Sequence, residues 1–64
     1  MLSKTRIFNN KKYQLKEVIN RGDGGSNTAK SAADAYREEG WFVRVIEGYH
    51  PEVGKEWYLY CRGK

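Results

Sequence analysis

The candidates for catalysis or metal binding in this 64-residue chain are His50, Glu52 and Cys61. His50 and Glu52 stand two residues apart, but no second histidine and no neighbouring carboxylate pair completes a metal site or an acid–base pair. Cys61 is the only cysteine, which excludes an intramolecular disulfide and a zinc site built from cysteines. We therefore expect no catalytic activity, no bound metal and no cofactor.

A different chemistry is indicated by two segments in which aromatic and cationic residues alternate. Strand side chains alternate between the two faces of a sheet, so the even positions of residues 40–47 and 56–62 share one face. Such surfaces bind single-stranded nucleic acid, because bases stack on the rings while cations hold the phosphates. Lysines and Gln14 of an earlier strand extend this surface. The predicted nucleic-acid-binding residues are Lys12, Lys16, Phe42, Arg44, Tyr58, Tyr60 and Arg62.

Two other interpretations of this face stay open. Tyr and Phe are good strand formers, and a half-exposed sheet face contains them without any ligand. The face is also suited to burial against a second copy, which would make the chain a protein–protein interaction module or a homodimer formed through the sheet. Strand addition along an exposed edge is a further route to a protein partner.

The charge distribution agrees with a polyanionic partner. The formal net charge is +4 and the isoelectric point is about 9.4. Residues 1–21 carry six Lys and Arg and one Glu, whereas residues 22–40 carry two basic and four acidic side chains. Positive charge thus collects on the expected strands, as nucleic-acid binding requires. Many small soluble domains carry this much charge for solubility alone.

Size and composition limit the other classes. Sixty-four residues correspond to one small domain over 1–64, near the lower limit for a chain that folds on its own apolar core. No apolar run follows the first residues, so we expect no signal peptide, and none approaches the roughly 20 apolar residues of a membrane span. A lone cysteine favours a reducing compartment, so we expect a cytoplasmic protein.

The elements that would position these residues begin with a hairpin. Asn9-Asn10 predicts a two-residue type I′ turn between a first strand and a second strand over residues 11–19. Glu17 interrupts the apolar set Tyr13, Leu15 and Ile19, which predicts a β-bulge or the end of pairing nearby. The glycine-rich segment 20–27 is expected to be a flexible loop. It matches neither the Walker A nor the dinucleotide pattern for phosphate.

A helix is predicted over residues 28–39, with Ser26, Asn27 or Thr28 as its N-cap. Its apolar stripe consists of Ala29, Ala32, Ala33 and Tyr36. Gly40 stands where a left-handed residue ends a helix. The next segment, 40–47, is apolar at both parities and is expected to be the central strand. Residues 48–55 are expected to form an exposed loop before a last strand over 56–62.

The predicted fold is α+β: a ββαββ chain with an antiparallel sheet and one helix packed on one face. The parity of the last strand that faces the helix is left open between Trp57/Leu59 and Tyr58/Tyr60. The expected core consists of Leu15, Ile19, Ala29, Ala32, Ala33, Tyr36, Val43, Val45, Trp57 and Leu59.

The chain resembles small uncharacterised prokaryotic proteins, mainly archaeal, of about this size. The resemblance rests on residues 7–13, on 29–41, on Val43-Arg44-Val45 and on the aromatic last strand. It implies a compact hairpin–helix–hairpin domain and no particular activity.

Overall fold

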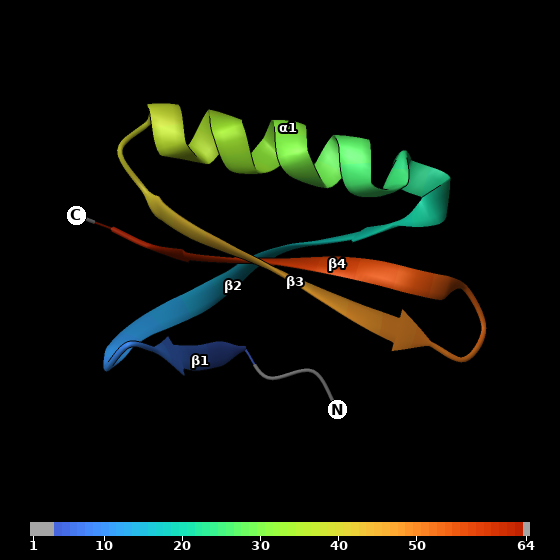
Figure 1. The fold of residues 1–64 in the computed structure, drawn as a ribbon, viewed down its shortest axis with the longest axis horizontal. Helices are drawn as coiled ribbons and strands as arrows, with labels where there is room; N and C mark the ends of the chain where they lie inside the picture. The colour runs from blue at the N-terminus through green and yellow to red at the C-terminus, as the bar shows by residue number, and fades with distance from the viewer. Residues whose placement is uncertain (1–3, 64) are drawn as a thin grey trace.

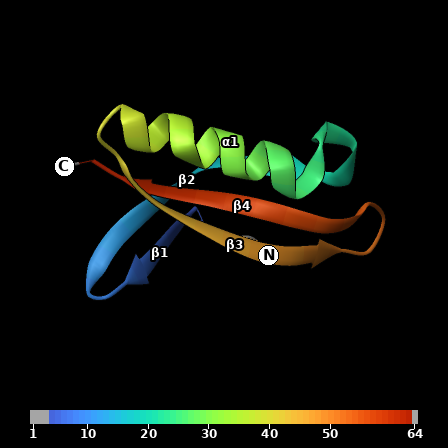
Figure 2. The ribbon, with the colours of Figure 1, turned by 45° about the horizontal axis from the view of Figure 1, so that its top comes forward.

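A computed structural model describes residues 4–63 and has the predicted ββαββ order (Figure 1). The elements are β1 (Thr5–Phe8), β2 (Lys11–Asn20), a 3-10 turn η1 (Arg21–Asp23), α1 (Gly25–Glu38), β3 (Phe42–His50) and β4 (Gly54–Arg62). The four strands form one antiparallel sheet, and α1 packs along one of its faces (Figure 2). The α+β fold expected from the sequence is therefore present.

The strand order is β1-β2-β4-β3, which corrects the expected position of β3. β2 and β3 are both antiparallel to β4, so they are parallel to each other, and α1 connects them. β4 lies between β2 and β3 and pairs with both. It is the central strand, with Trp57, Leu59, Tyr60 and Cys61 buried, whereas β3 forms an edge. The apolar composition of β3 at both parities was thus a misleading guide to its place.

The first hairpin has the predicted turn. Asn9 and Asn10 adopt φ angles of 50° and 64°, the left-handed values that a type I′ turn needs at both central positions. Phe8 pairs with Lys11 across this turn, and Arg6 pairs with Tyr13. The turn therefore fixes which side chains of β1 share a face with those of β2.

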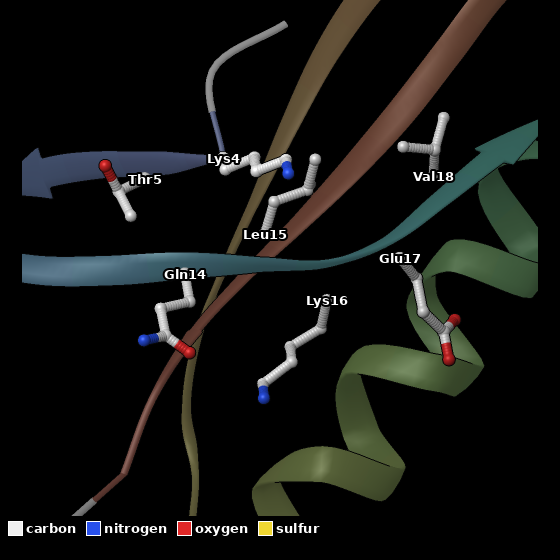
Figure 3. Close-up of a pocket in the computed structure, with 7 residues that line it drawn as sticks. All are labelled: Lys4, Thr5, Gln14, Leu15, Lys16, Glu17 and Val18. Carbon is white, nitrogen blue, oxygen red and sulfur yellow. The ribbon is translucent and has the colours of Figure 1, made fainter.

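The predicted bulge lies in β2, between Leu15 and Glu17, and it reverses the parity of the strand. Leu15 pairs with Tyr60, whereas Ile19 pairs with Trp57. Figure 3 shows the result, with Lys16 and Glu17 pointing to the side of the helix and Leu15 to the other side. The expectation that Leu15 and Ile19 share the core beneath the helix is therefore wrong.

The helix begins three residues earlier than predicted. Its N-cap is Gly24, at φ 103°, with no side-chain cap. The preceding turn has its own capping box, in which Asn20 and Asp23 exchange backbone-to-side-chain hydrogen bonds. The caps proposed at Ser26, Asn27 and Thr28 are thus wrong, because these residues already lie inside α1.

The helix ends as predicted. Gly40 has φ 97°. Its amide donates to the carbonyl of Arg37, and the amide of Trp41 donates to that of Tyr36. These two bonds make a Schellman motif, which turns the chain back toward the sheet.

The core between α1 and the sheet contains most of the predicted residues. Trp57 and Leu59, rather than Tyr58 and Tyr60, face the helix. Val45 is an exception, with 38% of its surface exposed, because β3 is an edge strand that the helix only partly covers. The buried cluster is Ile19, Ala29, Ala33, Val43, Trp57, Leu59 and Cys61, with Ala32, Tyr36 and Trp41 packed against it.

The segment expected to be an exposed loop is mostly strand. β3 continues to His50 and β4 starts at Gly54, so only Pro51–Val53 form the turn between them. Tyr49, at 75% exposed, projects from this end of the sheet. No helix in residues 4–63 has the length and apolar character needed to cross a membrane.

Candidate nucleic-acid interface

The sheet face turned away from α1, which we call the distal face, carries the even residues of β3 and β4. Pairing places Phe42 opposite Arg62, Arg44 opposite Tyr60 and Ile46 opposite Tyr58. The structure therefore brings together five of the seven predicted binding residues: Phe42, Arg44, Tyr58, Tyr60 and Arg62.

At the β1 end of this face, three rings form an aromatic cluster, which consists of Phe8, Tyr13 and Tyr60. The Phe8 ring meets Tyr13 edge-on at a centroid distance of 5.2 Å and meets Tyr60 at 6.0 Å. Tyr60 is fully buried and Tyr13 is 6% exposed. Tyr60 therefore lies on the predicted face, but its ring has no accessible surface on which a base can stack.

Three arginines lie over these rings. The guanidinium carbon of Arg6 is 5.5 Å from the Phe8 centroid and 5.8 Å from that of Tyr60. That of Arg44 is 5.7 Å from the Phe8 centroid. Arg62 lies 4.4 Å from the Phe42 ring and 5.8 Å from the Tyr13 ring. Each guanidinium is thus held by cation–π contact with at least one ring.

These three positive charges have no carboxylate partner among residues 4–63. The ion pairs within that range join Arg37 to Asp34 and Lys55 to Glu47, and none of the three arginines takes part in them. Nε of Arg62 is buried and has no hydrogen-bond partner there. Arginines that have no carboxylate partner and lie over rings can still donate hydrogen bonds to a phosphate through their exposed N–H groups.

The other end of the distal face has a different character. Tyr58 donates a hydrogen bond to Oε1 of Glu56 at 3.0 Å. Partial burial and this bond raise the pKa of the Tyr58 phenol above its usual value of 10.0. The Tyr58 ring lies directly against Gly48 of β3, where no side chain separates it from the backbone. Charge therefore changes along the face, from three arginines at one end to a carboxylate at the other.

Lys12 and Lys16 do not extend the distal face, which corrects their predicted role. Gln14 pairs with Cys61, so it shares the helix side of the sheet with Lys12, two positions away. Lys16 is the bulged residue, and its Nζ lies 5.0 Å from the Trp41 ring. Both lysines add to the overall positive charge but not to the arginine cluster.

The sequence reading missed Arg6, Phe8 and Tyr13 as members of the site. A signal for them was present in the hairpin, because a two-residue turn at Asn9-Asn10 pairs Arg6 with Tyr13. The missing information was the exact position of the predicted bulge in β2, which decides the face to which this pair belongs. In a regular strand without the bulge, Tyr13 and Ile19 would have the same parity, and Tyr13 would be assigned to the helix side together with Ile19.

Of the surface grooves along the sheet, two differ clearly in the chemistry of their lining. One, of about 350 Å³, borders the arginine cluster and is lined by Tyr13, Arg37, Trp41, Phe42, Val43 and Arg44. The other, of about 480 Å³, lies where β1 begins and β2 bulges (Figure 3), and its lining is Lys4, Thr5, Gln14, Leu15, Lys16, Glu17 and Val18. The first combines cations with rings, whereas the second mixes charges of both signs.

The residues considered for catalysis do not come together. Nδ1 of His50 accepts a hydrogen bond from the Glu52 amide at 3.1 Å, which stabilises the turn between β3 and β4. Cys61 is buried beneath the helix, and burial raises the pKa of its thiol. Comparison of the chain with protein-family models, with curated proteins and with solved structures found no match, so we infer function from the chemistry of the distal face.

Proposed function

We propose that this protein binds nucleic acid, preferentially single-stranded, through the arginine–aromatic end of the distal face. The observation that carries the proposal is the convergence of Arg6, Arg44 and Arg62 without a carboxylate partner in residues 4–63. A phosphodiester backbone supplies the negative charges that this cluster lacks. The protein acts as a non-enzymatic binding domain.

Single-strand preference follows from Phe42, a well-exposed ring that lies beside the aromatic cluster and contacts Arg62. Phe42 has 40% of its surface exposed, and Arg62 stacks on it. A base placed against Phe42 keeps its phosphate within reach of Arg62 and Arg44, which lie on neighbouring strands. A duplex keeps its bases stacked inside and gains only the charge interaction. Phe42 thus takes the stacking role first expected of Tyr60.

Titration of labelled single- and double-stranded oligonucleotides at low and at physiological salt tests this function. We expect tighter binding of the single strand and an affinity that falls steeply with salt. Each phosphate contact contributes about 0.7 to the slope of log K against log salt for a single strand. Lys12→Gln and Lys16→Gln change the same unit of charge on the other side of the sheet and should weaken binding less than Arg44→Gln. Absence of binding at low salt would refute the proposal.

A homodimer formed through the distal face is the second candidate. Val18 is 42% exposed on this face, beside the half-buried Leu15, Ile46 and Tyr58. Together these side chains form an apolar area between the arginine end and Glu56. Sedimentation equilibrium decides this candidate, because a mass of 7.5 kDa at high protein concentration would exclude the dimer.

A further inference from the structure

The two edge strands of the sheet approach each other above the distal face. β1 and β3 are separated by β2 and β4 in the strand order. Even so, the guanidinium groups of Arg6, on β1, and Arg44, on β3, lie 5.5 Å and 5.7 Å from the centroid of the same Phe8 ring. The sheet therefore curls strongly at this end, and Phe8 is the point at which its edges meet.

This closure places two like charges around one ring. The guanidinium carbons of Arg6 and Arg44 lie 5.5 Å and 5.7 Å from the Phe8 centroid, so they are at most about 11 Å from each other. Cation–π attraction holds each arginine in place, but the two charges repel each other, and no carboxylate of residues 4–63 forms an ion pair with either. The approach of β1 to β3 is thus favoured by the cation–π contacts and opposed by the repulsion between Arg6 and Arg44.

We propose that Arg6 and Arg44 form a phosphate clamp across the two sheet edges, and that bound nucleic acid holds β1 closed. The proposal rests on the proposed function and adds to it a binding residue, Arg6, and a coupling between ligand and strand. A phosphate near both guanidinium groups accepts hydrogen bonds from each and removes their repulsion. The ligand contributes this stabilisation only when β1 is docked, because β1 carries Arg6.

The coupling has a measurable consequence. β1 is only four residues long and has one neighbour in the sheet, β2. Short edge strands open locally at low cost in free energy, so their amides exchange with solvent faster than those of a central strand. A ligand that binds only the docked form reduces the population of the open form. Amide exchange in β1 should therefore slow when nucleic acid binds.

The first test measures affinity for a labelled single-stranded oligonucleotide in four variants. Arg6→Gln and Arg44→Gln should each weaken binding about fivefold or more and lower the salt slope by about 0.7. Lys30→Gln removes one exposed charge from α1 and is the matched control, with a smaller loss expected. Arg6→Lys retains the charge but not the planar group, and should lose part of the affinity. Thermal unfolding of each variant checks that its fold is retained.

The second test is hydrogen exchange of the β1 amides with and without the oligonucleotide, followed by NMR. Slower exchange in the wild-type protein, lost in Arg44→Gln, supports the clamp. If the wild-type protein binds but Arg6→Gln behaves like Lys30→Gln, or if exchange in β1 is unchanged, the clamp is wrong and the binding function stands. If the wild-type protein does not bind the oligonucleotide, both the clamp and the binding function are wrong.

Discussion

The guanidinium group of Arg44 lies over the Phe8 ring, although β3 and β1 form opposite edges of the sheet. Through this contact the distal face is folded over on itself at one end. Phe8 thereby covers Tyr60, which has no exposed surface, and the cluster works as a second small core. A chain of 64 residues gains buried area on both faces of its central strand in this way.

The buried position of Tyr60 predicts that its loss affects stability. Tyr60→Ala removes the ring at the centre of the aromatic cluster and should lower the free energy of unfolding by about 3–5 kcal/mol. Urea denaturation followed by circular dichroism measures this loss. Tyr49→Ala is the matched control, because Tyr49 is 75% exposed and its removal should change stability by no more than about 0.5 kcal/mol. Equal stability of the two variants would contradict the assigned core.

Phe42 is expected to contribute to binding more than to stability. Phe42→Ala should cost about 1–3 kcal/mol of affinity for a single-stranded oligonucleotide, the usual range for one stacked base, and much less for a duplex. Fluorescence anisotropy titration with both oligonucleotides checks this difference. Tyr49→Ala removes an exposed ring at the far end of β3 and should leave both affinities unchanged. Parallel losses for single strand and duplex would argue against stacking.

Gly48 is required by the Tyr58 ring on the neighbouring strand. A Cβ atom at position 48 would lie 2.8 Å from Cζ of Tyr58, closer than real side chains allow. Gly48→Ala therefore displaces the ring and its hydrogen bond to Glu56, and should destabilise the protein by about 1–3 kcal/mol. Gly63→Ala is the control, since its Cβ would meet Trp41 at an ordinary 3.6 Å. Chemical denaturation of the two variants should separate them clearly.

Stability should fall at alkaline pH. The pKa values of Cys61, Tyr36 and Tyr58 are all raised, mainly by burial, from ordinary values of 9.0 for the thiol and 10.0 for the phenols. The unfolded chain therefore loses these protons at lower pH than the folded protein does. Because the folded state then binds more protons, the free energy of unfolding decreases as pH rises above about 9.

Urea unfolding between pH 7 and 11 measures this decrease. The Tyr36 hydroxyl donates to Oε1 of Glu17 at 3.1 Å, an additional cause of its raised pKa. Tyr36→Phe has no proton to lose and should show a shallower decrease above pH 10. A pH-independent free energy of unfolding over this range would contradict the assigned burial of these groups.

The local elements could be predicted from the sequence because short-range chemistry specifies them. Asn9-Asn10 tolerates positive φ and produces the type I′ turn, and Gly40 ends α1 in the left-handed conformation. The period-two pattern placed Phe42, Arg44, Tyr58, Tyr60 and Arg62 on one face, and the structure has all five there. These features depend on residues within a few positions of one another or on strand alternation alone.

Only the tertiary structure decided which strand is central and which rings are covered. β4 lies between β2 and β3 because α1 carries the chain across the sheet, and a local pattern contains no information about that crossover. The bulge at Lys16 moved Leu15 and Tyr13 to the distal face, since one extra residue reverses strand parity. The curl that brings Phe8 onto Tyr60 and Arg6 beside Arg44 joins residues far apart in sequence. The sequence alone therefore indicated a basic aromatic face, and the folded chain determined which of its rings are buried and which arginines surround them.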